Sequence, residues 1–124
     1  MLYIGCVGRD KYADFLTSAC RAAGVQVEYR IDDDQPTGRC GVIITDHNRS
    51  MCTNLGAANH YRIEHLRQAC IWQMVEAARV YFVGGYHLTV CPEAVMALAE
   101  EAAAKNKVIG KDIFHPIGPA DIVC

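Results

Sequence analysis

The sequence lacks an excess of charge of either sign. Its 12 lysines and arginines stand against 14 aspartates and glutamates, which gives a formal net charge of −2. Proteins that bind DNA, RNA or anionic membranes usually present a strongly basic surface. The near balance of charge therefore argues against nucleic acid or a membrane surface as a partner.

Long hydrophobic runs are also missing. No apolar run approaches the roughly 18 residues that a membrane span requires. The first residues, Met1-Leu2-Tyr3-Ile4, contain neither the basic region nor the cleavage site of a signal peptide. We therefore expect a cytoplasmic protein without a membrane-spanning helix.

Cysteine is plentiful, but the spacings that signal disulfides or metal sites are absent. The chain has 7 cysteines, an odd number, and no two are separated by two residues, which argues against a disulfide framework. His60 and His65 are poorly spaced to share one helical face at a metal. The acidic run at 32–34 is expected to be a solvated turn. We expect buried, reduced cysteines and no bound metal.

The glycines form none of the standard phosphate-binding motifs. A P-loop needs spaced glycines followed by Lys-Ser/Thr, and a dinucleotide-binding turn needs three glycines at fixed spacing. Residues 5–8 and 84–85 satisfy neither pattern, and no nucleophile elbow is present. Gly8 and residues 84–86 do follow strands, where ligands of open α/β sheets gather, although tight turns explain the same glycines.

What is present is an alternation of strands and helices suited to one small domain. Residues 2–7 predict a buried strand, and Asp10 predicts the N-cap of the helix that follows. Gly24 predicts its end, and the alternating residues 25–31 predict a second strand. The helix carries an apolar stripe of Phe15, Leu16, Ala19, Ala22 and Ala23.

The middle of the chain predicts a β-hairpin, with strands at 41–45 and 49–53 around a turn at 46–48. Helical periodicity then runs from residue 55 to 78, with an apolar stripe of Ile63, Leu66, Cys70, Met74 and Ala78. A buried strand at 80–83 and a helix beginning at Pro92 follow. This order predicts an α/β fold, part of a doubly wound sheet with a small β-hairpin lid.

Three blocks of the sequence, at residues 5–12 (GCVGRDKY), 35–59 and 84–90 (GGYHLTV), resemble those of adenosine kinases in the ribokinase-like, PfkB-type kinase family. The resemblance continues to about residue 107. It implies a partial ribokinase-like core at 1–24 and 55–107, lid strands at 25–54, and a divergent tail of unknown structure at 108–124.

The resemblance also implies the residues of a nucleoside site. Cys40, Met51 and Thr53 match positions that line the nucleoside pocket, and Tyr86 matches an aromatic residue that stacks on adenine. Arg49 matches an arginine that approaches the transferred phosphate. Strand alternation alone places Arg49, Met51 and Thr53 on one side of the hairpin. Taken without the resemblance, Arg49 reads as a solvated turn residue, Cys40 as a buried thiol and Tyr86 as a half-buried residue at a strand end.

The family activity implied is transfer of the γ-phosphate of magnesium-ATP to the 5′-hydroxyl of adenosine, which yields AMP in purine salvage. Two alternatives stay open. The chain could be a non-catalytic module that binds a nucleoside or a partner protein, or it could derive from another PfkB-type sugar or nucleoside kinase.

The segments that supply catalysis in this family are not found between residues 1 and 124. These are a Gly-Ala-Gly-Asp segment, which contains the general base and the anion hole, and an Asn-x-x-Glu motif that orders magnesium. The sequence thus resembles an incomplete central segment, with neither ATP nor Mg²⁺ expected to bind to it alone. Open sheet edges would favour self-association or complementation by a missing part.

Phosphoryl transfer relies on positioning and charge stabilisation, so we expect no activity from this chain by itself. Purified protein incubated with adenosine and magnesium-ATP should form no AMP above the enzyme-free rate, as measured by chromatography. ATP-dependent accumulation of AMP would contradict this expectation.

Overall fold

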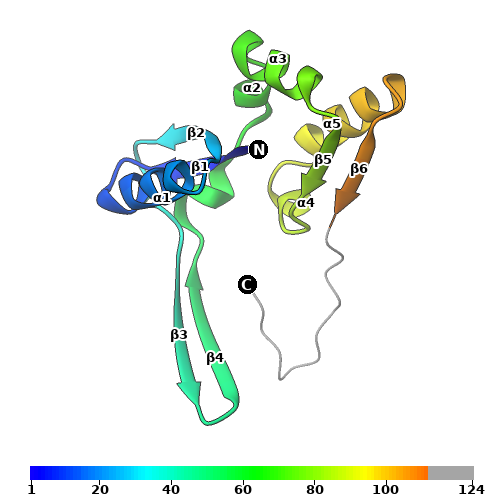
Figure 1. The fold of residues 1–124 in the computed structure, drawn as a ribbon. Coiled ribbons are helices and arrows are strands. Elements are labelled where there is room, and N and C mark those ends of the chain that lie inside the picture. Colours follow the sequence, from blue (N-terminus) through cyan, green and yellow to red (C-terminus); the bar gives the residue numbers. More distant parts are fainter. Residues whose placement is uncertain (112–124) are drawn as a thin grey trace. The chain divides into compact units, whose positions relative to one another are not determined.

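The computed structural model describes residues 1–111. They divide into two compact units, with the boundary between His60 and Tyr61 (Figure 1). Leu2 alone is grouped with the second unit. Among the described residues, no helix is both long and apolar enough to cross a membrane.

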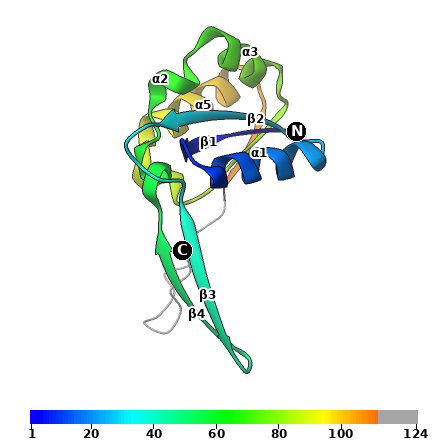
Figure 2. The same cartoon turned by 90° about the vertical axis from the view of Figure 1, so that its left-hand side faces the viewer.

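The first unit contains two pairs of strands and one long helix. Its elements are β1 (Leu2–Gly8), α1 (Lys11–Ala22), β2 (Gln26–Asp32), β3 (Arg39–Thr45), β4 (Asn48–Asn54) and the 3₁₀ helix η1 (Gly56–His60). β1 pairs with β2, and β3 pairs with β4. Figure 2 shows β3 and β4 as a long ribbon that extends away from β1, β2 and α1. The predicted strand, helix, strand and hairpin are all confirmed.

Both ends of α1 form as their residues predict. The Asp10 side chain accepts hydrogen bonds from the backbone N–H groups of Tyr12 and Ala13, which lack partners within the helix. At the other end Gly24 adopts a φ of 71°. Glycine populates this left-handed region without steric cost, so it terminates the helix readily.

The apolar stripe of α1 does not face a core among the described residues. Phe15 is 64% exposed and Leu16 is 43% exposed, while the helix buries only Ala13. The helical period of the apolar residues predicted an apolar face correctly, but this period carries no information on what covers that face. The buried apolar residues of the first unit are instead Cys6, Val7, Ala13 and Ala57.

The second unit combines a two-stranded sheet with short helices. Its elements are α2 (Ile63–Leu66), α3 (Ala69–Ala77), β5 (Val80–Val83), α4 (His87–Val90), α5 (Pro92–Ala104) and β6 (Val108–Lys111). β5 and β6 are parallel, with Val80 opposite Val108. Pro92 occupies the first turn of α5, as predicted. The core contains Tyr61, Leu66, Ile71, Val75, Tyr81, Val83, Cys91, Ala94 and Ala102.

Two expectations for this part of the chain were wrong. The helical period from 55 to 78 is not one helix, because Gln68 adopts an extended ψ of 133° between α2 and α3. After this break the residues that α3 buries are Ile71 and Val75, whereas Cys70 is exposed. β5 is also buried on one face only: Tyr81 and Val83 are covered, but Val80 and Phe82 are 64% and 75% exposed.

The base of the hairpin is fixed to the start of α1 through Asp10 and Thr37. Asp10 accepts a hydrogen bond from the Thr37 backbone N–H at 2.9 Å and another from the Thr37 hydroxyl at 2.7 Å. The hydroxyl oxygen in turn accepts the Gly8 N–H at 3.0 Å. The hydrogen bonds from Thr37 hold the pKa of the Asp10 carboxyl below its ordinary value of 3.8. One carboxylate thus caps a helix and holds the strand that enters the hairpin.

Close backbone packing makes glycine necessary at this junction. A Cβ atom added to Gly8 would lie 2.6 Å from the Thr37 nitrogen and 2.8 Å from the Pro36 carbonyl carbon. Backbone atoms cannot swing aside as the end of a flexible side chain can. A larger residue at position 8 therefore forces β1 away from the base of the hairpin.

We expect Gly8→Ala to lower the free energy of unfolding by about 1–3 kcal/mol, the usual cost of overpacking a tight site. Gly41→Ala is the matched control, because its added Cβ meets only the Cys52 carbonyl oxygen at 3.8 Å. Urea unfolding followed by circular dichroism measures both variants. Equal midpoints for the two variants would contradict this account of the junction.

Candidate functional site

The hairpin gathers four of the five predicted site residues on one face. In the antiparallel register of β3 and β4, Cys40 is opposite Thr53, Val42 is opposite Met51, and Ile44 is opposite Arg49. Directly opposed residues project to the same side of a sheet, and every second pair shares that side. These three pairs therefore form one surface, here called the Met51 face.

The Met51 face differs from the opposite face in composition. Four of its six residues are apolar, namely Cys40, Val42, Ile44 and Met51. The other face is formed mainly by polar residues and glycine, together with Ile43 and Cys52. Val42 and Ile44 are 50% and 74% exposed. An exposed apolar surface of this kind is typical of a binding surface rather than a core.

The pair nearest the base of the hairpin carries polar atoms. The Thr53 hydroxyl donates a hydrogen bond to the Cys40 sulfur at 3.1 Å. Cys40 and Cys52 are both exposed, and they project from opposite faces. The expectation of buried cysteines thus holds for Cys6 and Cys91 but is wrong for Cys40, Cys52 and Cys70, which are exposed. Cys20 is half-buried, and Cys124 lies outside the described residues.

Two arginines of the hairpin have different surroundings. The guanidinium of Arg39, at the base, lies 4.7 Å from the centre of the Tyr12 ring, a cation–π contact with α1. Arg49 lies near the turn on the Met51 face, is exposed, and has no ion pair within the described part of the chain. Its charge is therefore available to an anion outside these residues.

The acidic run before the hairpin is only partly a solvated turn. Asp32 is 6% exposed and accepts hydrogen bonds from Arg30 and from the backbone N–H groups of Asp34 and Gln35. His60 lies 3.4 Å from the same carboxylate. The hydrogen bond from Arg30 lowers the pKa of Asp32. The prediction was wrong for Asp32, since this residue fixes the chain that leads into the hairpin.

Tyr86, the fifth predicted site residue, belongs to the second unit. It directly precedes α4, its side chain is 40% exposed, and its carbonyl oxygen accepts a hydrogen bond from the Thr89 hydroxyl at 2.8 Å. The neighbouring His87 packs against Tyr61, with the ring centres 4.9 Å apart. Burial lowers the pKa of the His87 imidazole below its ordinary value of 6.5. His87 thus acts as a neutral packing residue beside Tyr86.

Sequence reasoning missed the importance of Thr37, although it identified Asp10 as a helix cap. Thr37 is 3% exposed and joins β1, α1 and β3. A short polar residue between proline and glycine looks like part of an ordinary turn. Its contacts are 27 and 29 positions away along the chain, and no local pattern signals them.

A family model described as pfkB family carbohydrate kinase matches residues 1–121. The chain belongs to this family. The match extends beyond residue 107, where the resemblance judged from the residues alone ended. Its fold is confirmed by solved structures: Anopheles gambiae adenosine kinase in complex with P1,P4-di(adenosine-5) tetraphosphate superposes with a TM-score of 0.85 at 37% identity, over 89% of this chain and 32% of that one.

The curated relatives described next are also named adenosine kinases. Schizosaccharomyces pombe adenosine kinase is 47% identical over 86% of this chain and 32% of its own length. Arabidopsis thaliana adenosine kinase 2 is 42% identical over 92% of this chain and 33% of its own length. Schistosoma mansoni adenosine kinase in complex with 2-fluoroadenosine superposes with a TM-score of 0.84 at 30% identity, over 89% of this chain and 32% of that one. This chain therefore spans about a third of the length of these relatives.

Proposed function

We propose that this chain contributes the lid and part of the nucleoside pocket of a cytoplasmic, ATP-dependent adenosine kinase. The reaction is phosphorylation of the 5′-hydroxyl of adenosine to AMP. The names of the relatives support this proposal, as do the adenosine derivatives bound by two of the similar structures. The observation that carries it is the Met51 face of the hairpin.

The Met51 face suits a nucleoside because it combines apolar surface with a few polar atoms. Met51 and the neighbouring Val42 offer apolar contacts to a flat base. The thioether sulfur of Met51 is polarisable and adapts to aromatic surfaces. The Cys40–Thr53 pair places a hydroxyl and a thiol at the end of the face near the base of the hairpin. Pockets for small molecules are typically apolar with a few such polar groups.

Arg49 is assigned to the transferred phosphate, and Tyr86 to the adenine ring. A guanidinium presents several N–H donors in a planar fork that matches phosphate oxygens. Stacking of a base on an aromatic side chain contributes roughly 1–3 kcal/mol. Both residues are exposed enough to contact a ligand.

The described residues do not fit a magnesium site. Between residues 1 and 111, no group of three or more His, Cys, Asp or Glu side chains lies close enough together to hold a metal. We therefore assign no residue of this chain to Mg²⁺, and Arg49 is the one residue assigned to the phosphates of ATP. Its proposed work is binding and orienting the nucleoside and placing one positive charge near the phosphate.

Cysteine footprinting tests the proposal, because the two faces of the hairpin each carry one exposed thiol. In the 124-residue chain, adenosine should slow alkylation of Cys40 at least threefold and leave Cys52 unchanged, as measured by mass spectrometry of peptides. Cytidine serves as the control ligand.

Two lysine substitutions sharpen the test. Met51→Lys adds a charged chain to the Met51 face and should abolish the protection of Cys40. Ser50→Lys adds the same charged chain to the opposite face and should leave the protection of Cys40 by adenosine unchanged. Equal protection of Cys40 and Cys52, or no protection by adenosine, would refute the assignment of the Met51 face to the nucleoside.

A further inference from the structure

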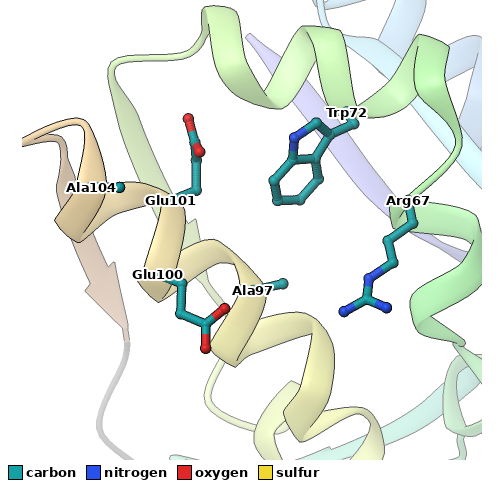
Figure 3. A pocket seen from close by; sticks show the side chains of 6 residues that line it. All are labelled: Arg67, Trp72, Ala97, Glu100, Glu101 and Ala104. Carbon is teal, nitrogen blue, oxygen red and sulfur yellow. The ribbon is translucent and has the colours of Figure 1, made fainter.

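The second unit contains a surface cavity of about 510 Å³ that is largely open to solvent. Its lining includes none of the residues discussed above. Its lining residues come from the end of α2, from α3 and from α5: Arg67, Trp72, Ala97, Glu100, Glu101 and Ala104 (Figure 3). The volume falls within the range typical of small-molecule sites.

Small residues on α5 keep this cavity open. Ala97 and Ala104 are seven positions apart, so they lie on one side of the helix, two turns from each other. Figure 3 shows the Trp72 indole facing this side of α5, with Arg67 and Glu101 on either side of it. Methyl groups are too short to fill the space beneath the indole. One flat aromatic wall therefore remains accessible.

The polar groups around the indole differ in whether they already have partners. Glu101 is engaged by Lys107, whose ammonium lies 3.2 Å from its carboxylate and also donates to the Tyr81 hydroxyl at 2.8 Å. The hydrogen bond with Tyr81 is the main cause that raises the pKa of Lys107. Glu101 is thus neutralised within the protein.

Arg67 and Glu100, unlike Glu101, have no charged partner among the described residues, and the Trp72 indole N–H has no acceptor among them. The cavity therefore presents one unpaired cation, one unpaired carboxylate and one indole. These are the groups that recognise a ligand with a flat ring, an anionic group and a hydrogen-bond donor.

We propose that this cavity binds a flat aromatic anion that also carries an amino group, the chemistry of a purine nucleoside monophosphate. The ring stacks on Trp72, the anionic group pairs with Arg67, and the amino group donates to Glu100. Such stacking is worth roughly 1–3 kcal/mol per base. Guanidinium–phosphate hydrogen bonds are among the strong ones in proteins.

Simpler ligands fit the lining less well. A bare anion would gain Arg67 but approach the unpaired carboxylate of Glu100 and leave the Trp72 ring without a contact. A bare cation would gain Glu100 and be repelled by Arg67. An uncharged ring would stack on Trp72 and leave both charges without partners. The proposal does not rest on the proposed kinase function, because the two sets of residues do not overlap.

Tryptophan fluorescence tests the proposal directly, since the chain contains 1 tryptophan. Titration of the 124-residue chain with AMP should quench Trp72 in a saturable way. Half-saturation should need about tenfold less AMP than adenosine, and inorganic phosphate should cause no quenching. The indole N–H signal in an ¹⁵N correlation spectrum provides a second reading at the same site.

Matched arginine variants identify the anion contact. Arg67→Gln should weaken AMP binding about tenfold and bring it to the affinity of adenosine. Arg67→Lys should retain part of the difference in affinity between AMP and adenosine. Arg79→Gln changes an exposed arginine outside the cavity and should leave AMP binding unchanged. Circular dichroism confirms that the variants fold alike.

The proposal is overturned if AMP leaves both Trp72 signals unchanged, or if adenosine binds as tightly as AMP. It is also overturned if Arg67→Gln and Arg79→Gln behave alike. Quenching of Trp72 at unchanged AMP concentrations in Arg67→Gln would mean that AMP binds elsewhere in the chain.

Discussion

The contact between Asp10 and Thr37 fixes the arrangement of the first unit. The Asp10 carboxylate accepts hydrogen bonds from two N–H groups at the start of α1 and from the backbone and hydroxyl of Thr37. Thr37 also accepts the Gly8 N–H at the end of β1. A strand end, a helix start and the entry to the hairpin therefore meet at two side chains. Thr37 is buried. If its contact with Asp10 were broken, each of these polar groups would lose a hydrogen-bond partner, and water could not easily replace it.

The functional proposal depends on this anchor because the hairpin has little support of its own. Nearly every residue of β3 and β4 is exposed, and an isolated two-stranded hairpin is marginally stable in water. Its register defines the Met51 face, but the register alone does not orient that face. Orientation comes from the base, where the Thr37–Asp10 hydrogen bonds and the Arg39–Tyr12 contact tie the ribbon to the start of α1. A lid that closes over a nucleoside needs this combination of a fixed base and an exposed apolar face.

Local features of the sequence predicted much of this fold. The strands, the Asp10 cap, the Gly24 stop, the hairpin and the start of α5 depend on short-range chemistry, and all formed as expected. The wrong expectations about burial share one physical cause. The period of the apolar residues shows which residues could be buried, but tertiary contacts decide which residues are buried. The stripe of α1 and one face of β5 are apolar yet exposed. The buried Asp32 likewise has one distant neighbour, His60, which lies 3.4 Å from its carboxylate and which no local pattern signals.

The candidate site was predictable to a similar degree. Alternation placed Arg49, Met51 and Thr53 on one side, and the register adds Cys40 to them. The chemical role of each residue came from the family resemblance. Thr37 was missed because a buried threonine and a turn threonine look the same in sequence.

Amide hydrogen exchange by NMR in a Thr37→Val variant tests the central claim most directly. Valine keeps the shape but removes the hydroxyl, which leaves the Gly8 N–H without its acceptor, a loss of about 1–3 kcal/mol for a buried group. We predict faster exchange at Gly8 and Ala57, the latter bonded to Pro36 at the same junction, with little change in the β3–β4 ladder. Thr17→Val, which removes a hydroxyl bonded only within α1, should leave these amides unchanged. Unaltered exchange at Gly8 in Thr37→Val would contradict the account.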